Sequence, residues 1–482
     1  MSKYLYFSIP LGLFIIQAIY TLNSFNQIRI EELIVSVRNV FWLQNHLVFN
    51  GAMSDLGWYG QLLFLYKIFG FHLYLAKFLR LGFAFFSLYC LAAVLKNYLG
   101  IKRAWLPLVT IGLSPTLLYF NVLQVQYGVD LQYFPIVLYL AMTLNFKKVN
   151  SAYIKSILLA SFSMIAWMSY PAFIFYLPVL AIIYFKRVFK QVRRKQKLIL
   201  NLVVCTIAFI LPLILSVSYV KNRELLWNDP LVGRGMFRSN GTVDLSRETV
   251  FDNFQMTITD LFESGISWHF EAKKAEFSDY YPIVTLAFVL FTALAAIFKG
   301  DKFGKVLLIL ILALAVNFIV MNLTGPSGGI RRGTVILVIF YALFTFVWAR
   351  IYHQKNGPAK TIALGMCAVL LIHHVISYPV NLNHLKQFGR FREDVWFAQA
   401  ETPAASLALF VNIVTKSDLT LICRDQTGQN VECKHYSLIY PAIAGSCVWN
   451  NLNCKKIIIY DGKLQELIPL TIDYWGRSSK GV

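Results

Sequence analysis

Charged residues are scarce in this chain. Only 14% of its 482 residues are Asp, Glu, Lys or Arg, whereas roughly a quarter of the residues in a soluble globular protein are charged. Hydrophobic residues make up 57% of the chain, and uncharged stretches long enough to cross a bilayer core of about 30 Å recur along it. The composition therefore excludes an ordinary soluble enzyme and predicts an α-helical polytopic membrane protein.

Acidic residues are scarcer than basic ones, at 24 against 45, which gives a net charge of +21. Such an excess could indicate nucleic-acid binding, but the basic residues gather in short loops between apolar segments. The densest group contains Lys186, Arg187, Lys190, Arg193, Arg194, Lys195 and Lys197. Because short Lys/Arg-rich loops stay on the cytoplasmic side of a membrane, this charge predicts topology, and no nucleic-acid partner is expected.

The first apolar segment is not followed by a small-residue cleavage site, so it is predicted to be a signal anchor. Counting basic loops from there predicts about 11 transmembrane helices, with the N-terminus cytoplasmic and the C-terminal part extracytoplasmic. The predicted spans are residues 5–22, 73–95, 105–122, 131–146, 157–170, 171–185, 198–219, 281–298, 306–323, 334–348 and 362–377. Together they form a transmembrane domain over residues 1–379, with outer loops at 23–72 and 220–279.

Two apolar stretches need separate interpretation. Residues 58–70 are too few for a span and contain Lys67, so we expect an interfacial helix within the first outer loop. Residues 157–185 are uncharged, with Pro171 in the middle. Two short helices that meet at Pro171 keep the basic loops before and after this stretch on one side of the membrane, and proline is suited to the break because it lacks a backbone donor.

Residues 380–482 are predicted to form a small α/β domain outside the membrane. Residues 395–414 have an amphipathic helical pattern, and "LTLICRD", "YSLIYPA" and "KKIIIYDG" are typical of short strands. Four of the seven cysteines lie here without a CxxC spacing: Cys423, Cys433, Cys447 and Cys454. Two disulfides are the favoured interpretation, in sequential pairing, and reduced thiols or a zinc site are the alternatives.

The few charges predicted to face outward are candidates for chemistry. Glu31 and Glu32 follow the first span, although they could simply favour the dipole at the start of an interfacial helix. Asp130 lies at the outer mouth of a span, where a carboxylate is costly unless it meets water, a cation or a partner; a solvated aspartate at a helix start is the alternative. Arg331 and Arg332 follow a glycine-rich outer turn, where they could grip a phosphate or contact lipid headgroups.

Two stretches resemble a known family. "EELIVSVRNVFWLQNHLVFNGAMSDLGWYGQLLFLYKIFGFHLYLAKFLRLGFAFFSLYC" is similar to the first outer loop and second span of the GT-C superfamily of integral membrane glycosyltransferases. That superfamily includes the protein O-mannosyltransferases and the aminoarabinose transferase of lipid A. In these enzymes an Asp-Glu pair opens the loop, and a short helix ending in Phe-Gly precedes an arginine that begins the next span. These features match Glu31-Glu32, Phe69-Gly70 and Arg80.

"SPTLLYFNVLQVQYGVDLQYF" resembles the next region of the family, whose acid falls on Asp130, and the loop with Arg331 and Arg332 resembles the late outer loop whose arginine holds the lipid phosphate. The resemblance covers the first 150 residues well and the rest more loosely. Two departures are visible, because the first acid is Glu31 rather than Asp, and Leu56-Gly57-Trp58 replaces a Pro-Pro. The WWDYG signature of the oligosaccharyltransferase branch is absent from the sequence.

The resemblance implies a bacterial inner-membrane glycosyltransferase that moves a sugar from a polyprenyl-phosphate donor to a lipid, glycan or protein acceptor on the outer side, with inversion. Glu31 would be the general base, while Glu32 or Asp130 would orient it, help to hold a metal or contact the sugar. Glu31 and Asp130 would hold a divalent cation, Mg or Mn, if the reaction uses one. The expected donor-phosphate ligands are Arg331, Arg332 and Arg80, and the expected substrate-contacting loop residues are Asp55, Trp58 and Tyr59.

A lipid or solute transporter, such as a flippase, is the first alternative. It would place charged or polar residues near the middle of spans, or show an inverted repeat, and most predicted spans lack charge. His373 and His374 are the main polar interruption, and we interpret them as packed rather than catalytic. A non-catalytic scaffold is the second alternative, in which Asp130 and the arginine pair would have no role.

Overall fold

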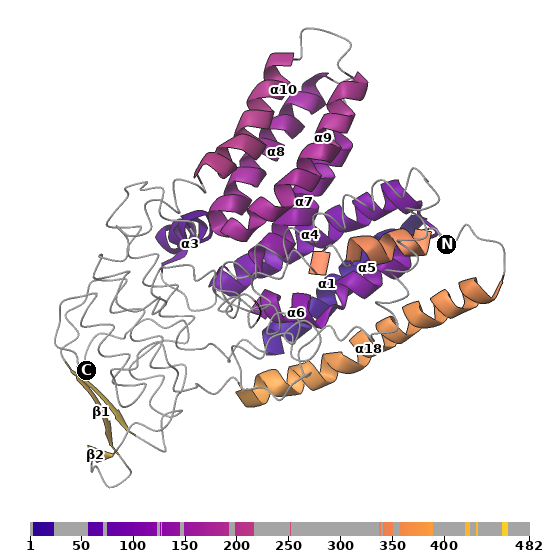
Figure 1. Ribbon diagram of the computed structural model, residues 1–482. Helices are drawn as coiled ribbons and strands as arrows, with labels where there is room; N and C mark the ends of the chain where they lie inside the picture. Colours follow the sequence, from indigo (N-terminus) through magenta and orange to yellow (C-terminus); the bar gives the residue numbers. More distant parts are fainter. Residues whose placement is uncertain are drawn as a thin grey trace.

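The computed structural model describes most of the first half of the chain and parts of the second. The described residues are 3–23, 56–70, 75–122, 126, 128–144, 149–191, 198–215, 251, 337–338, 341–349, 357–388, 420–424, 430–431 and 456–460. Nearly all of them are helical (Figure 1). A helical membrane protein was predicted, and the described part agrees with that fold class.

The first half of the chain is a helical bundle. Its first elements are α1 (Lys3–Asn23), α4 (Leu75–Leu99), α5 (Trp105–Gly112), α6 (Pro115–Val122) and α7 (Val129–Thr143). Helix α4 packs extensively along α7 and also against α1. Leucine and aromatic side chains of α1, α4, α5 and α6, joined by residues of the 337–348 segment and of α18, form a hydrophobic core between these helices.

The predicted span at residues 105–122 is not one continuous helix. It consists of α5 and α6, which are separated by Leu113 and Ser114. Pro115 explains the interruption, because it has no N–H to donate to Ile111 and its ring would clash there. The Ser114 N–H instead bonds the Ile111 carbonyl in a tighter turn, at 3.1 Å.

The predicted break at Pro171 is confirmed. Helix α8 (Val149–Ser169) ends before it, and the 3₁₀ helix η1 (Pro171–Tyr176) leads into α9 (Leu177–Gln191). Tyr170 is extended, with φ −155° and ψ 115°, as expected for a residue before proline. Helix α10 (Leu198–Cys205) packs against α8 (Figure 1) and continues into a π-helical turn, η3 (Thr206–Ile210), which contacts both α8 and α9.

The contacts between helices agree with the alternating directions predicted for four of the first six spans, those at 73–95, 131–146, 157–170 and 171–185. Gln132 near the start of α7 bonds the backbone of Arg80 near the start of α4, so these two helices begin at the same level. Tyr176, just before α9, also meets the start of α7, whereas Lys155 near the start of α8 bonds the end of α7 at Thr143. Helices α4, α7 and α9 therefore run in one direction and α8 runs in the other.

Helix α18 (Pro358–Phe388) has 31 residues and is longer than the span predicted at 362–377. It runs along one side of the bundle (Figure 1), in contact with α1, α5 and α6. The boundary predicted between residues 379 and 380 falls inside this helix, although Pro379 lies there. The helix continues through Pro379 although proline cannot donate a backbone bond to Val375 and its ring crowds that turn.

Three strands are described in the C-terminal part. They are β1 (Thr420–Arg424), β2 (Asn430–Val431) and β3 (Lys456–Tyr460), in the sheet order β2-β1-β3. Strand β1 pairs antiparallel with β2 and parallel with β3. Strands β1 and β3 fall within the predicted "LTLICRD" and "KKIIIYDG" segments.

The rest of the C-terminal prediction lies outside the described residues. This concerns the amphipathic helix at 395–414, the "YSLIYPA" strand, and Cys433, Cys447 and Cys454. Only Cys423 lies on a described element, in β1. The α/β domain and its two disulfides therefore stay predictions.

Two of the described helices are long and apolar enough to cross a membrane, Leu75–Leu99 in α4 and Ser151–Ser169 in α8. Other helices carry exposed apolar stripes; in α1, Phe7, Leu11 and Ile15 are each about half exposed at every fourth position. Residues four apart share one helix face, and such apolar faces mark lipid or protein contact. The spans at 281–298 and 306–323 lie outside the described residues, and the total of eleven stays a prediction.

Candidate functional site

Helix α3 (Leu56–Phe69) occupies the position of the predicted interfacial helix at 58–70. It lies against α8 and α4. One face is buried and carries Trp58, Tyr59, Leu62 and Tyr66, whereas Phe64 on the other face is 63% exposed. Burial raises the pKa of the Tyr66 hydroxyl above its ordinary value, so this side chain stays neutral.

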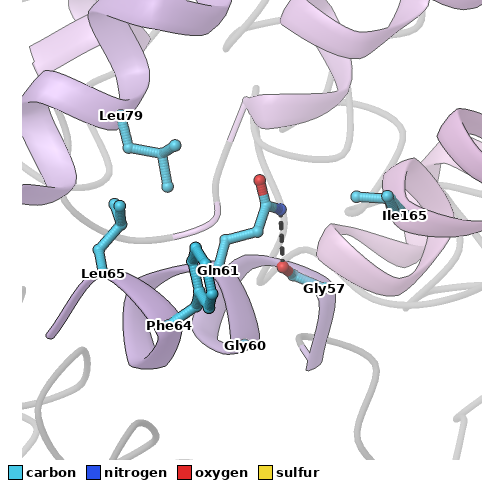
Figure 2. A pocket seen from close by; sticks show the side chains of 7 residues that line it. All are labelled: Gly57, Gly60, Gln61, Phe64, Leu65, Leu79 and Ile165. Atoms are coloured by element: carbon cyan, nitrogen blue, oxygen red, sulfur yellow. Dashed lines mark hydrogen bonds between the residues drawn. The ribbon is translucent and has the colours of Figure 1, made fainter. Parts of the chain in front are cut away.

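Gly57 allows the close approach of α3 to α8. A Cβ at this position would lie 2.7 Å from the backbone carbonyl of Ile165 and from the backbone nitrogen of Ser169. Neither backbone atom can move without shifting α8. Glycine is therefore required here, because only without a Cβ can α3 come close enough to α8 (Figure 2) for Trp58 and Tyr59 to be buried.

Replacing Gly57 with valine is expected to destabilise the protein by about 1–3 kcal/mol, the usual cost of forcing extra atoms into a packed contact. The measurement is thermal unfolding of the purified protein in detergent. Gly60→Ala is the matched control, because a Cβ at Gly60 meets no heavy atom within 4 Å and alanine favours a helix. Equal melting temperatures for the two variants would contradict the close α3–α8 contact.

Two cations are fully buried near the start of α4. Lys77 and Arg80 lie one helical turn apart, and neither side chain has solvent exposure. The Arg80 guanidinium carbon lies 4.8 Å from the centre of the Trp58 ring, a cation–π arrangement. Arg80 and Trp58, both assigned to the site from the sequence, are thus brought together, whereas Lys77 was not predicted.

Asp130 is the second residue of α7 and is also fully buried. Gly128 forms the turn that leads into α7 just before Asp130. Its φ of 74° is left-handed, and a Cβ there would overlap the Phe120 side chain, so this turn requires glycine. Oδ2 of Asp130 accepts a hydrogen bond from the Tyr176 hydroxyl at 2.9 Å. The interpretation of Asp130 as a solvated helix-start residue is therefore wrong, because burial of a carboxylate demands partners.

Tyr176 was not predicted from the sequence. Its hydroxyl donates to Asp130, and its ring stacks on Phe134 of α7 with the ring centres 4.7 Å apart. It is the last residue of η1, so the break at Pro171 delivers it to the start of α7. That proline is the one sequence signal that points to this position.

Hydrogen bonds connect the buried face of α3 to α7. The Tyr59 hydroxyl donates to the side chain of Gln126, two residues before Gly128. Gln61 donates to the Tyr133 hydroxyl at 2.8 Å, and Arg80 of α4 lies over the Trp58 ring of α3. Helices α3, α4 and α7 therefore share one set of buried polar side chains. We call it the polar cluster, and it consists of Trp58, Tyr59, Gln61, Arg80, Gln126, Asp130, Tyr133 and Tyr176.

A second polar group ties α1 to the rest of the bundle. Gln17 donates to the Gly112 carbonyl at 2.9 Å, Asn121 donates to Gln17 at 3.0 Å, and Gln132 donates to Asn121. These amides lie within predicted spans and were not singled out in the sequence. They bond to one another and to the backbone, as buried polar groups in a helix bundle do.

His374 is fully buried, as the interpretation of a packed residue expects. Its Nδ1 lies 2.8 Å from the Thr110 carbonyl. A carbonyl can only accept, so Nδ1 carries the hydrogen. The contact joins α18 to α5.

Several predicted site residues lie outside the described residues. These are Glu31, Glu32, Asp55, Arg331 and Arg332. Within the part of the chain that the structure describes, no group of three or more His, Cys, Asp or Glu side chains could hold a metal ion. The cation site at Glu31 and Asp130 stays a prediction, because one of its two ligands is not described.

No protein-family model matches the chain, and no curated protein matches it in sequence. The function is therefore argued from the residues and contacts described above.

Proposed function

We propose that this protein is an integral membrane glycosyltransferase that moves a sugar from a polyprenyl-phosphate donor to a lipid, glycan or protein acceptor. The transfer takes place on the outer side of the membrane. One observation carries the proposal: a carboxylate, Asp130, and two cations, Lys77 and Arg80, are fully buried near the starts of two helices that begin at the same level. Under the predicted topology, both starts face the outer leaflet.

Burial of these charges costs free energy that packing alone does not require. Ionisable residues inside a membrane domain are therefore functional candidates. A cationic end of α4 suits the phosphate of a lipid-linked donor, because arginine stabilises the negative charge that develops as a phosphate leaves. Arg331 and Arg332 are proposed to contact the same phosphate.

The proposed reaction is a single displacement. The acceptor oxygen attacks the anomeric carbon, the bond from that carbon to the phosphate oxygen breaks, and polyprenyl phosphate leaves with the electron pair. The Glu31 carboxylate takes the proton of the acceptor hydroxyl as general base, and the anomeric configuration is inverted. If Mg or Mn is bound, it neutralises charge on the phosphate.

Asp130 is proposed to act beside Glu31, fixed by Tyr176. Trp58 and Tyr59 line the adjoining wall, since the first stacks under Arg80 and the second bonds the turn that precedes Asp130. The N-terminus is proposed to be cytoplasmic and the C-terminal domain extracytoplasmic, in a bacterial inner membrane.

The test uses purified protein in proteoliposomes with radiolabelled polyprenyl-phosphate sugars and lipid, glycan and protein acceptors. We expect label to pass from one of the donors to an acceptor, with release of polyprenyl phosphate. Movement of intact donor across the bilayer without transfer would instead support a flippase. That result would contradict the proposal.

A further inference from the structure

The last two turns of α9 carry two exposed cations, Lys186 and Arg187. Within the part of the chain that the structure describes, neither side chain forms a hydrogen bond or an ion pair. The opposite face of the same turns is buried through Tyr184 and Val188. The Tyr184 hydroxyl donates to Asn201 of α10 at 2.9 Å. The two cations therefore lie on the outward face of a helix end that is packed against the bundle.

The neighbouring sequence offers no carboxylate that could neutralise these cations. Residues 131–223 contain no Asp or Glu, and more basic residues follow in the sequence: Lys190, Arg193, Arg194, Lys195 and Lys197. Asp130 is the only carboxylate among the described residues. It bonds Tyr176, which precedes Lys186 by ten residues and so by about 15 Å along the helix. That distance is too long for an ion pair, and the positive charge is uncompensated within the described part of the chain.

Exposed apolar side chains place the same helix end at the boundary of a membrane. Phe189 is 78% exposed, and its ring stacks on Phe185 with the ring centres 6.0 Å apart. Ile199, near the start of α10, is 76% exposed. Such exposure is costly in water but not in lipid. Because Phe189 lies beyond Lys186 and Arg187 on the helix, the long stems of the two cations are suited to reach from hydrocarbon depth to the headgroup layer.

We propose that the end of α9 binds the headgroups of anionic phospholipids through Lys186 and Arg187. The guanidinium can hold two phosphate oxygens at once, and the ammonium adds a point charge. Clusters of basic residues directly beside a membrane span attract anionic lipids in this way. A zwitterionic phospholipid has the same phosphate, but its own amine neutralises it. A soluble polyanion would leave the exposed Phe189 ring in water.

This lipid is distinct from the polyprenyl-phosphate donor. Helices α7 and α9 run in the same direction, so the end of α9 lies far from the start of α7, where Asp130 and the proposed donor site are found. Under the predicted topology the end of α9 faces the cytoplasmic leaflet. The inference rests on the membrane location in the proposed function and not on the transfer of a sugar.

The test is photo-crosslinking of the full chain in phosphatidylcholine nanodiscs that contain increasing fractions of phosphatidylglycerol with a diazirine on its headgroup. We expect the chymotryptic peptide with residues 186–189 to be labelled in the wild type. The double variant Lys186→Gln with Arg187→Gln is expected to need about 25-fold more probe for equal labelling. This estimate follows because each basic side chain near an anionic surface strengthens binding by about fivefold.

Two variants serve as controls. Lys186→Arg with Arg187→Lys exchanges the two cations and keeps the charge, so its labelling is expected to stay at the wild-type level. Lys67→Gln removes an exposed lysine from α3, a helix that contacts the end of α8 rather than its start. Labelling of the α9 peptide is expected to be unchanged in this variant also.

Equal labelling of the double glutamine variant and the wild type would overturn the proposal. Labelling of the wild type as strong with a phosphatidylcholine probe that carries the same diazirine would also overturn it, because the surface would then not select charge. Protection by a short RNA at a lower phosphate concentration than unlabelled phosphatidylglycerol would assign the surface to a soluble polyanion instead. If the double variant does not fold, each single glutamine variant is expected to show a loss of about fivefold. No sugar donor is present in this experiment, so failure of the transfer assay would leave its result unchanged.

Discussion

Asp130→Asn is expected to lower the rate of sugar transfer by about 100- to 1,000-fold, the usual effect of removing one preorganised electrostatic contact from an active site. Asparagine has nearly the same shape and can still accept the hydrogen bond from Tyr176, so the change removes mainly the negative charge. The measurement is the turnover of labelled donor by the purified variant. Thermal unfolding is measured on the same preparation, because removing one charge from a set of buried charges destabilises a protein, and turnover is compared at a temperature at which the variant stays folded.

Tyr176→Phe tests how Asp130 is held. Phenylalanine keeps the ring that stacks on Phe134 and removes only the hydroxyl that bonds Asp130. We expect a smaller loss of turnover, about tenfold, with the KM for the donor unchanged, because Tyr176 positions Asp130 and does not itself bind the donor.

Tyr184→Phe is the control for the loss of a buried tyrosine hydroxyl. The Tyr184 hydroxyl donates to Asn201 at 2.9 Å, between α9 and α10 and away from the polar cluster. This variant is expected to turn over at the wild-type rate. Turnover of Asp130→Asn within a few-fold of the Tyr184→Phe control would remove Asp130 from the mechanism.

Glu31→Gln is expected to abolish sugar transfer while leaving the fold intact. Loss of the general base should lower the rate by about 100- to 10,000-fold, since glutamine cannot take the proton of the acceptor hydroxyl. Turnover and thermal unfolding are measured on the same preparation.

Glu31→Asp is the matched variant, because it keeps the carboxylate and restores the aspartate of the family that the sequence resembles. We expect it to retain a measurable part of the activity. Unchanged turnover in Glu31→Gln, or equal loss in both variants, would show that the carboxylate of residue 31 is not the base.

The sequence predicted those features of the fold that depend on local pattern. Helix α3 was identified because its apolar run is short and interrupted by Lys67, and the break at Pro171 because a proline stands in an uncharged stretch too long for one crossing. The division between α5 and α6 was missed although Pro115 is visible in the sequence. The apolar run at 105–122 has the length of one ordinary span, so hydropathy alone does not indicate that the helix is interrupted at Pro115.

The site was predicted only in part, because its contacts join residues distant in the chain. Arg80, Trp58, Tyr59 and Asp130 were predicted through the resemblance and through the cost of a charge in a membrane. Tyr176 reaches Asp130 across 46 residues, and the bond from Asn121 to Gln17 spans 104. Such pairings depend on which faces of two helices meet, and no periodicity along the chain encodes this.

The central claim is that the side chains of Glu31, Asp130, Arg80, Arg331 and Arg332 line one cavity that is open to the outer leaflet. A cryo-electron microscopy structure of the protein with a non-transferable polyprenyl-phosphate sugar analogue tests it most directly. The account predicts that the analogue's phosphate contacts Arg80, Arg331 or Arg332, while its anomeric carbon faces the Glu31 carboxylate beside Asp130. An analogue bound elsewhere, or these side chains on separate faces or toward the cytoplasm, would contradict it.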